Sequence, residues 1–178
     1  MTDSMILTVQ NHLEHDPRLE GWSPLGIGMT FETDKWVELI LSYSLTETVP
    51  DYLEQMFERA QGCAVYGCYH YPLFTLAVEE LFRLKESALR EAVRETRASK
   101  TVLKQSYADL LKWAYKENLI DQQRHDQWQA ARELRNITSH KGDYLLLGPN
   151  DAIGHLQFTV EMTDEIFRAC RTHSKSSS

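Results

Sequence analysis

The chain has 178 residues, of which 42% are hydrophobic and 25% charged, as is typical of one folded globular domain. Its formal net charge of -7 argues against a protein coated with nucleic acid over its whole surface. No apolar run approaches the roughly 18 residues of a membrane span, and the first residues lack a secretory signal, so we expect a cytoplasmic protein.

The first part of the chain predicts a loop-rich cap followed by two helices. Residues 1–32 hold several Gly and Pro residues and show no sustained hydrophobic period, so they are assigned to the cap. Apolar residues then recur at helical spacing from Thr33, a candidate N-cap, to about Thr46. A second helix begins with Pro50 in its first turn and is interrupted by Pro72, near Tyr69.

The rest of the chain predicts four further helices. Residues 72–95 form the strongest helical pattern and the expected longest helix, because over twenty residues pass without a breaker. Further helices are expected over 101–119, from Asp121 to Gly142, and over 151–173. Short connections favour antiparallel neighbours, so we expect an all-α antiparallel bundle of about five to six helices over residues 33–172, with a disordered tail at 173–178.

Charge is distributed unevenly along the chain. Residues 1–89 carry 14 acidic and 5 basic side chains, whereas residues 90–178 carry 12 acidic and 14 basic ones. Within residues 94–116 six cations face only Glu95 and Asp109. This pattern is typical either of a solvated helix face or of a surface that attracts an anionic partner.

Most motifs that would reveal a chemistry are absent from the sequence. There is no GxxxxGK[ST], GxGxxG or HExxH, which excludes the usual phosphate-loop, dinucleotide and zincin sites. The cysteines show no CxxC pair, so we expect reduced thiols and no disulfide framework. Two weaker metal-ligand groupings are Cys63, Cys68 and His70, and the N-terminal group of His12, His15 and Asp16.

The segment LRNITSH (134–140) combines two groups suited to phosphodiester chemistry. Arg135 offers a planar fork that matches phosphate oxygens, and His140 offers an exchangeable proton near neutral pH. Five positions on an ideal helix span about 140°, so the two side chains do not quite share a face. A second copy of the chain, or a frayed last turn before Gly142, would bring them together.

This segment, together with the preceding helix containing YGCYHYPLFTLAVEELFRL, resembles the HEPN superfamily of helical-bundle proteins. The mark of that family is an Arg, an adjacent polar residue and a His after four to six intervening positions. The resemblance covers roughly residues 33 to 170 and implies a dimeric, metal-independent endoribonuclease, often a toxin or an antiviral effector. It assigns these roles to Arg135, Asn136 and His140. A Tyr found two positions after the His in one toxin subgroup is replaced here by Gly142.

The resemblance implies cleavage of RNA by attack of the ribose 2′-hydroxyl, with no cofactor and no metal. His140 would exchange protons, Arg135 would stabilise phosphoryl charge, and Asn136 would orient the phosphate or Arg135. Lys141 and Arg132 would attract the RNA backbone. The expected partners are RNA, a second copy of the chain, and a cognate antitoxin or defence-system protein, with no membrane.

Two alternatives stand beside this interpretation. Arg135 and His140 could merely stabilise a helix C-terminus through the helix dipole, in a catalytically silent HEPN-like module that binds a partner protein or a nucleotide. A second pair, Arg168 and His173, has the same spacing, but it precedes the predicted disordered tail, where no packed neighbour is expected to hold it.

Overall fold

In a computed structural model, residues 6–24, 30–140 and 146–176 are described, and within these ranges the protein is helical with no strand. The first long helices are α1 (Thr33–Leu41), α2 (Asp51–Tyr66) and α3 (Pro72–Glu95). The others are α4 (Lys100–Leu103), α5 (Tyr107–Lys116), α6 (Gln122–His140) and α7 (Pro149–Ser176), and a 3-10 turn lies at Pro17–Leu19. The prediction of an all-α helical bundle is therefore confirmed.

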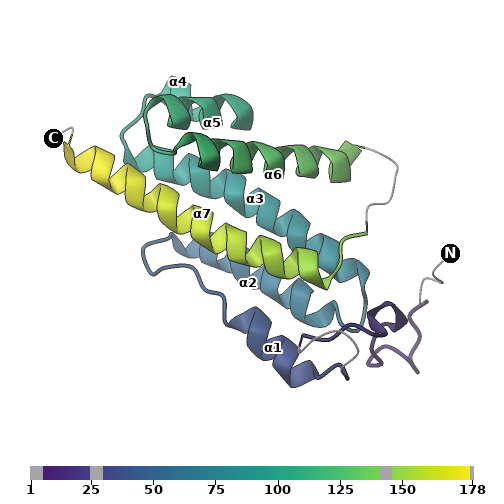
Figure 1. Cartoon of the computed structure of the whole chain (residues 1–178). Helices are drawn as coiled ribbons and strands as arrows, with labels where there is room; N and C mark the ends of the chain where they lie inside the picture. The colour runs from purple at the N-terminus through teal and green to yellow at the C-terminus, as the bar shows by residue number, and fades with distance from the viewer. Residues whose placement is uncertain (1–5, 25–29, 141–145, 177–178) are drawn as a thin grey trace.

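The bundle is built around α3, which packs chiefly against α2 and α7 (Figure 1). Helices α3 and α7 form the central pair. Helices α1 and α2 lie on one side of this pair, and α4, α5 and α6 lie on the other. Among the described helices, none is long and apolar enough to span a lipid bilayer.

Neighbouring helices are not all antiparallel. Helices α2 and α3 run in opposite directions, since Arg59 lies 2.8 Å from Glu80 while Tyr52 reaches Glu91. Helices α3 and α7 run in the same direction (Figure 1). The reason is topological: α6 runs opposite to α3, and α7 runs opposite to α6. Antiparallel packing is thus found between α2 and α3 and between α6 and each of α3 and α7, but not for the central pair of α3 and α7.

Capping side chains explain where the helices differ from their predicted bounds. The expected fourth helix is divided into α4 and α5, because the Ser106 hydroxyl accepts the backbone N–H of Asp109 at 3.2 Å and begins a new helix. Thr33 is the first residue of α1 and Glu32 is its N-cap, so Thr33 does not act as the cap. Helix α3 has the predicted bounds, but α7 is longer, with 28 residues against 24. Helix α7 also continues through Ser176, beyond the predicted end of the bundle.

The core joins all the long helices through apolar side chains that are fully buried. Trp36 of α1 is among the largest of them, and its Nε1 donates to the carbonyl oxygens of Ala64 and Val65 at 3.1 and 3.2 Å. Gln61 of α2 in turn donates to the Ile40 carbonyl at 2.8 Å. These bonds satisfy polar groups that would otherwise be buried without partners, and they fix α1 on α2.

The N-terminal segment is anchored to the α2–α3 turn by Asp16, which is buried. Its carboxylate accepts hydrogen bonds from Arg18 Nε at 2.8 Å and from the Tyr71 backbone N–H at 2.9 Å. Burial alone would raise the pKa of Asp16, but these bonds outweigh it and lower the pKa. Asp16 therefore has a structural role, which accounts for this member of the N-terminal group of His12, His15 and Asp16.

Candidate functional site

The predicted catalytic segment lies at the C-terminal end of α6. Trp128 and Ala131 bury the inner face of this helix, while Arg132 and Arg135 are half-buried and Asn136 is exposed. The backbone of His140 forms the last residue of α6, about 7.5 Å along the axis from Arg135. The side chain of His140 and the whole of Lys141 lie outside the described residues.

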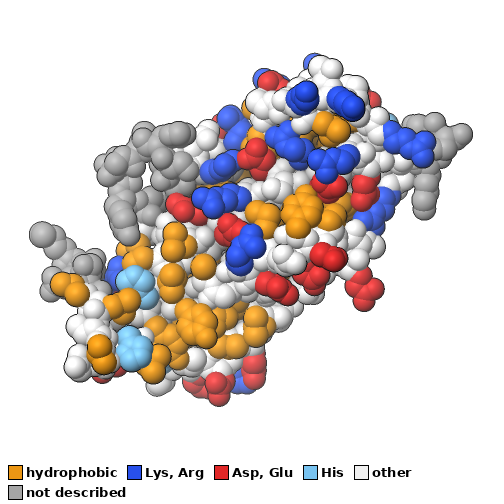
Figure 2. Space-filling model, turned by 180° about the vertical axis from the view of Figure 1, so that it is seen from behind, with side chains coloured by type: hydrophobic (Ala, Val, Ile, Leu, Met, Phe, Trp, Pro, Cys, Tyr) orange, Lys and Arg blue, Asp and Glu red, His pale blue; other side chains and the backbone are white. Residues whose placement is uncertain are grey.

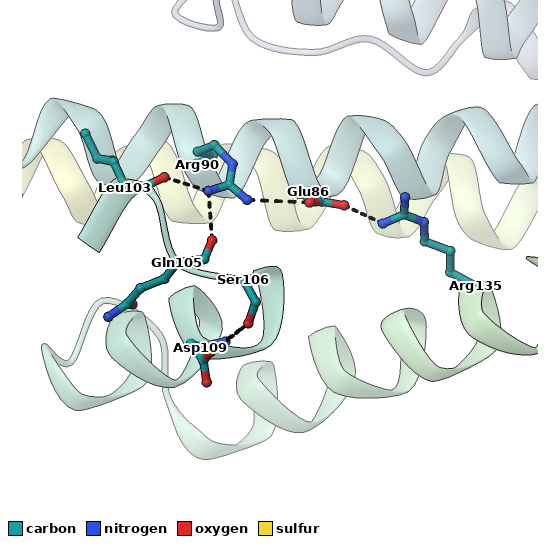
Figure 3. A network of polar contacts seen from close by, with 7 residues as sticks. All are labelled: Glu86, Arg90, Leu103, Gln105, Ser106, Asp109 and Arg135. Atoms are coloured by element: carbon teal, nitrogen blue, oxygen red, sulfur yellow. Dashed lines mark hydrogen bonds and ion pairs between the residues drawn. The ribbon is translucent and has the colours of Figure 1, made fainter. Parts of the chain in front are cut away.

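Arg135 forms an ion pair with Glu86 of α3 (Figure 3). Its Nη1 donates to Oε2 of that carboxylate, and both side chains keep about a third of their surface exposed, 35% and 27%. The other carboxylate oxygen, Oε1, accepts from Nη2 of Arg90 at 3.5 Å. Glu86 thus lies between two arginines and joins α6 to α3.

Arg90 extends this network to the segment between α4 and α5. Its Nη1 donates to the carbonyl oxygens of Leu103 at 2.7 Å and Gln105 at 3.2 Å. Three helices and a connecting segment are therefore linked through one chain of polar contacts (Figure 3). Because each contact restricts the rotamer of the next side chain, the position of the Arg135 guanidinium is fixed from α3 rather than from α6 alone.

Tyr107 closes this region from α5. Its ring packs edge-on against Trp128, with 6.3 Å between centroids, and it lies near Glu86, Arg135 and Arg132. Burial raises the pKa of Tyr107, and the nearby Glu86 carboxylate adds to this effect. The phenol is therefore neutral at physiological pH. Arg132 Nε donates to Gln129 Oε1 at 2.8 Å, on the same helix.

A groove lies beside this network, between the start of α2 and the second half of α3. It has a volume of about 270 Å³, and we call it the arginine groove. Its lining residues are Tyr52, Arg83, Glu86, Ser87, Arg90, Glu91 and Arg94. On the face opposite to that of Figure 1, Lys and Arg side chains gather over the part built from α3 to α6, interspersed with Asp and Glu (Figure 2).

The sequence interpretation missed Glu86 and most of this groove. Apart from Arg94, it used α3 only for its apolar stripe, although Arg83, Ser87, Arg90 and Arg94 follow each other at steps of four, three and four residues. That spacing places polar residues on one helical face and was a usable signal. The contact of Glu86 with Arg135 had no such signal, since it joins residues 49 positions apart.

The second Arg–His pair, Arg168 and His173, is also part of packed structure. Both lie on α7 and line an open pocket of about 560 Å³ with Arg124 and Leu119. The neighbouring Ser174 donates to the Glu95 carbonyl at 3.2 Å. The expectation that no packed neighbour surrounds this pair is therefore wrong, because α7 continues along the end of α3.

In each of the two weaker metal groupings, one member makes other contacts. Cys68 is buried and donates to the Val65 carbonyl at 3.2 Å, and burial raises its pKa to about 11. His15 bonds to Thr33 at 2.8 Å and stacks on Tyr69. Among the residues that the structure describes, no three His, Cys, Asp or Glu side chains lie together as a metal site would need.

A buried lysine lies one residue before Glu86. Lys85 is 1% exposed, and its Nζ lies 3.4 Å from His155 Nδ1 of α7 and 4.9 Å from the centre of the Phe82 ring. Burial lowers the pKa of Lys85 to about 7. Burial, helped by the adjacent Lys85, lowers the pKa of His155 to about 4.

Comparison with protein-family models, with curated proteins and with solved structures finds no match to this chain.

Proposed function

We propose that this protein is a metal-independent endoribonuclease of HEPN type that acts as a toxin or an antiviral-defence effector. The observation that carries the proposal is the position of Arg135. Its guanidinium is partly exposed, oriented by Glu86, and lies on the helix that ends at His140. A cation fixed in this way suits recognition of a phosphodiester whose charge increases during cleavage.

The chemistry uses the substrate's own nucleophile. His140 removes the proton of a ribose 2′-hydroxyl, and the oxygen forms a bond to the adjacent phosphorus. The bond from phosphorus to the 5′-oxygen breaks, and that oxygen takes up a proton from the protonated form of His140. The products are a 2′,3′-cyclic phosphate and a 5′-hydroxyl. Arg135 stabilises the negative charge on the phosphoryl oxygens in the transition state.

Other side chains of α6 and the following segment support binding in this proposal. Asn136 is exposed one position after Arg135 and orients the phosphate. Arg132 and Lys141 attract the RNA backbone, because basic side chains that pair with phosphates release the cations condensed on the RNA. No cofactor takes part in these steps.

The proposed active form is a homodimer. On an ideal α-helix, positions five residues apart lie about 140° apart around the axis, so we do not expect α6 alone to direct Arg135 and His140 to one point. Two copies related by a two-fold axis would each present the same segment to a shared groove. A cognate antitoxin or defence-system partner would then regulate this pair of sites.

A catalytically silent HEPN-like module is the second candidate, and one observation favours it. The Glu86 carboxylate already occupies Nη1 of Arg135, one of the guanidinium nitrogens with which a phosphate oxygen would otherwise pair. A module of this kind would use the same surface to hold a partner protein or a nucleotide without cleaving it.

Cleavage of single-stranded RNA by the purified protein in the presence of a chelator tests the proposal. We expect RNA to be cut and DNA to survive, because DNA lacks the 2′-hydroxyl. The new ends should be 2′,3′-cyclic phosphates. His140→Ala and Arg135→Ala should each lower the rate by about a hundredfold or more, with helicity unchanged.

Arg168→Ala and His173→Ala are the matched controls, since they remove the same residue types at the same spacing on another helix. Their rates should stay near that of the wild type. Intact RNA after incubation with the wild type at pH 6 to 9 would assign the protein to the silent class. Equal losses from both pairs of variants would show that Arg135 and His140 do not form the catalytic site. Growth arrest upon induced expression would support the toxin assignment.

A further inference from the structure

The arginine groove is directly connected to the candidate site. Glu86 lines the groove and also accepts the hydrogen bond from Arg135. The groove therefore borders the candidate site, and its lining residues on α3 run from Arg83 to Arg94. Eleven residues separate Arg83 from Arg94, which corresponds to about 16 Å along the helix axis. A strand bound at Arg135 would have a continuous path beside α3.

The cations of the groove differ in how firmly they are held. Arg90 donates to the backbone carbonyl oxygens of Leu103 and Gln105, which fix its position. These acceptors carry no net charge, so they do not neutralise the guanidinium. The side chains of Arg83 and Arg94 are 65% and 57% exposed. These two guanidinium groups are accessible to a ligand in solution.

The two carboxylates of the groove do not cancel this charge. Glu91 pairs with Arg94 and accepts a hydrogen bond from the Tyr52 hydroxyl at 3.2 Å. Glu86 is divided between Arg90 and Arg135. Beyond the lining, Arg83 lies 3.7 Å from Glu80, which Arg59 also contacts at 2.8 Å. With Arg59, Arg135 and Glu80 included, five arginines face three glutamates, so the local charge favours an anionic ligand.

Tyr52 adds an aromatic surface to these cations. Its side chain is 45% exposed at the start of α2. Burial of its inner part and the adjacent Glu91 raise the pKa of Tyr52 to about 12, so the phenol carries no charge that would repel phosphate. Proteins that bind single strands combine a cationic groove with exposed aromatic rings on which bases stack.

The groove is too small to enclose a whole strand. Its volume of about 270 Å³ is near the lower limit of small-ligand pockets, which begin at roughly 300 Å³. A bound strand would therefore continue beyond the groove along α3.

We propose that the arginine groove binds single-stranded RNA next to the cleavage position. Arg83 and Arg94 contact successive parts of the phosphate backbone, and the ring of Tyr52 stacks on a base. This inference rests on the proposed function, because Glu86 links the groove to Arg135. It adds a substrate path that the motif on α6 does not contain.

The test measures RNA binding without cleavage. The His140→Ala protein is titrated against a fluorescently labelled single-stranded RNA, and anisotropy is recorded at several salt concentrations. Arg83→Gln combined with Arg94→Gln should weaken binding about tenfold or more and reduce the slope of log K against log salt by about 1.4, at about 0.7 per lost phosphate contact. Lys35→Gln on α1 and Arg168→Gln on α7 remove exposed cations elsewhere and should leave affinity nearly unchanged.

Two substitutions at Tyr52 separate stacking from the hydrogen bond to Glu91. Tyr52→Leu should weaken binding about tenfold, as expected for one lost stacking contact, whereas Tyr52→Phe keeps the ring and should bind like its parent. Circular dichroism of each variant checks that helicity is retained. Equal weakening by Phe and Leu would overturn the stacking role.

Other outcomes distinguish this inference from the proposed function. If the wild type cuts RNA but the double arginine variant binds it with unchanged affinity and salt slope, the groove is not the substrate path. If the wild type cuts nothing while the groove variants lose RNA affinity, the ribonuclease proposal fails and the RNA-binding groove stands. Polyglutamate serves as a polyanion without bases. If the groove variants lose as much affinity for polyglutamate as for RNA, or if the His140→Ala parent does not bind RNA, the groove is not an RNA site.

Discussion

Glu86 of α3 accepts a hydrogen bond from Arg135 of α6, and this ion pair connects the predicted catalytic helix to the centre of the bundle. Both side chains are about one-third exposed, so solvent screens the pair and its contribution to stability is at most about 1 kcal/mol. Its greater effect is on orientation, since it determines which way the guanidinium points. Glu86 is therefore a positioning residue for Arg135.

Substitution of Glu86 should separate turnover from binding. We expect Glu86→Gln to lower kcat for RNA cleavage about tenfold, because Arg135 loses a charged acceptor that holds it in place. The same change should lower KM, because one negative charge near the phosphate path disappears. Steady-state kinetics on a short RNA measure both quantities, and urea unfolding should show a stability change of less than about 1 kcal/mol.

Glu133→Gln is the matched control for this variant. It removes one carboxylate from α6, but the Glu133 side chain is exposed to solvent. Its kcat should equal that of the wild type. A Glu86→Gln variant whose kcat is unchanged would show that Arg135 does not depend on Glu86 for its position.

The end of α2 provides a prediction about packing. Gly67 follows α2, and a Cβ atom built there would overlap the buried ring of Phe74. Gly67→Ala should therefore reduce the free energy of unfolding by about 1–3 kcal/mol, as overpacking does. Gly62 lies inside α2 and has no atom within 4 Å of the corresponding position. Gly62→Ala should increase that free energy by about 0.5–1 kcal/mol, because alanine favours the helix. Urea unfolding of both variants checks the opposite signs.

Hydrophobic periodicity predicted most of the fold because the helices bury apolar stripes of the expected spacing. The bounds of α3 follow from Pro72 at its first position and from an uninterrupted stripe up to Glu95. The break between α4 and α5 was missed, since the capping hydroxyl of Ser106 interrupts a pattern that still looks continuous. Parallel packing of α3 and α7 was missed because it depends on tertiary topology rather than on local sequence.

The candidate site was only partly predictable for the same reason. Local spacing indicated Arg135 and His140, because both lie within one helix. The pairing of Arg135 with Glu86 depends on how α6 aligns with α3, which no local pattern encodes. Lys85 was similarly hidden. A lysine is expected at the surface, yet here the neighbours Leu81, Leu84 and Leu89 are all buried on the same helix.

Mixing two inactive variants tests the proposed dimer. If each site takes Arg135 from one copy and His140 from the other, a mixed dimer of Arg135→Ala and His140→Ala chains contains one complete site. Random exchange of subunits should then restore about a quarter of the wild-type activity per chain. Cleavage of RNA by the mixture after dissociation and reassembly measures this recovery.

Sedimentation of the wild type at tens of micromolar supplies the control, since recovery requires a dimer. A monomer at that concentration would contradict the prediction. So would a dimer whose variants fail to complement each other, since its two residues would then act within a single chain.

Lys85 makes the stability of the bundle depend on pH. Burial lowers the pKa of Lys85 to about 7 in the folded protein, whereas the ordinary pKa of 10.5 applies in the unfolded chain. Between these two values the unfolded state binds more protons than the folded state, so stability rises with pH over this range. His155, with a pKa lowered from 6.5 to about 4, acts in the same direction between pH 4 and 6.5. The nearby rings of Phe82 and Phe158 offset part of the burial cost of the charged amine.

Replacing Lys85 by Met should therefore stabilise the protein most where the lysine is charged. A shift from 10.5 to about 7 corresponds to about 5 kcal/mol at most, which is the cost that Lys85→Met removes at or below pH 7. The advantage should shrink steadily as the pH rises from 7 to 9, because the wild type gains stability there and the variant does not. Urea unfolding of both proteins at pH 6, 7, 8 and 9 measures this difference, in which the titration of all other groups largely cancels.

Lys112→Met, at an exposed position on α5, should show no such trend. A Lys85→Met variant that is less stable at every pH, or whose advantage does not change with pH, would show that the Lys85 amine is not a buried charge in the folded protein.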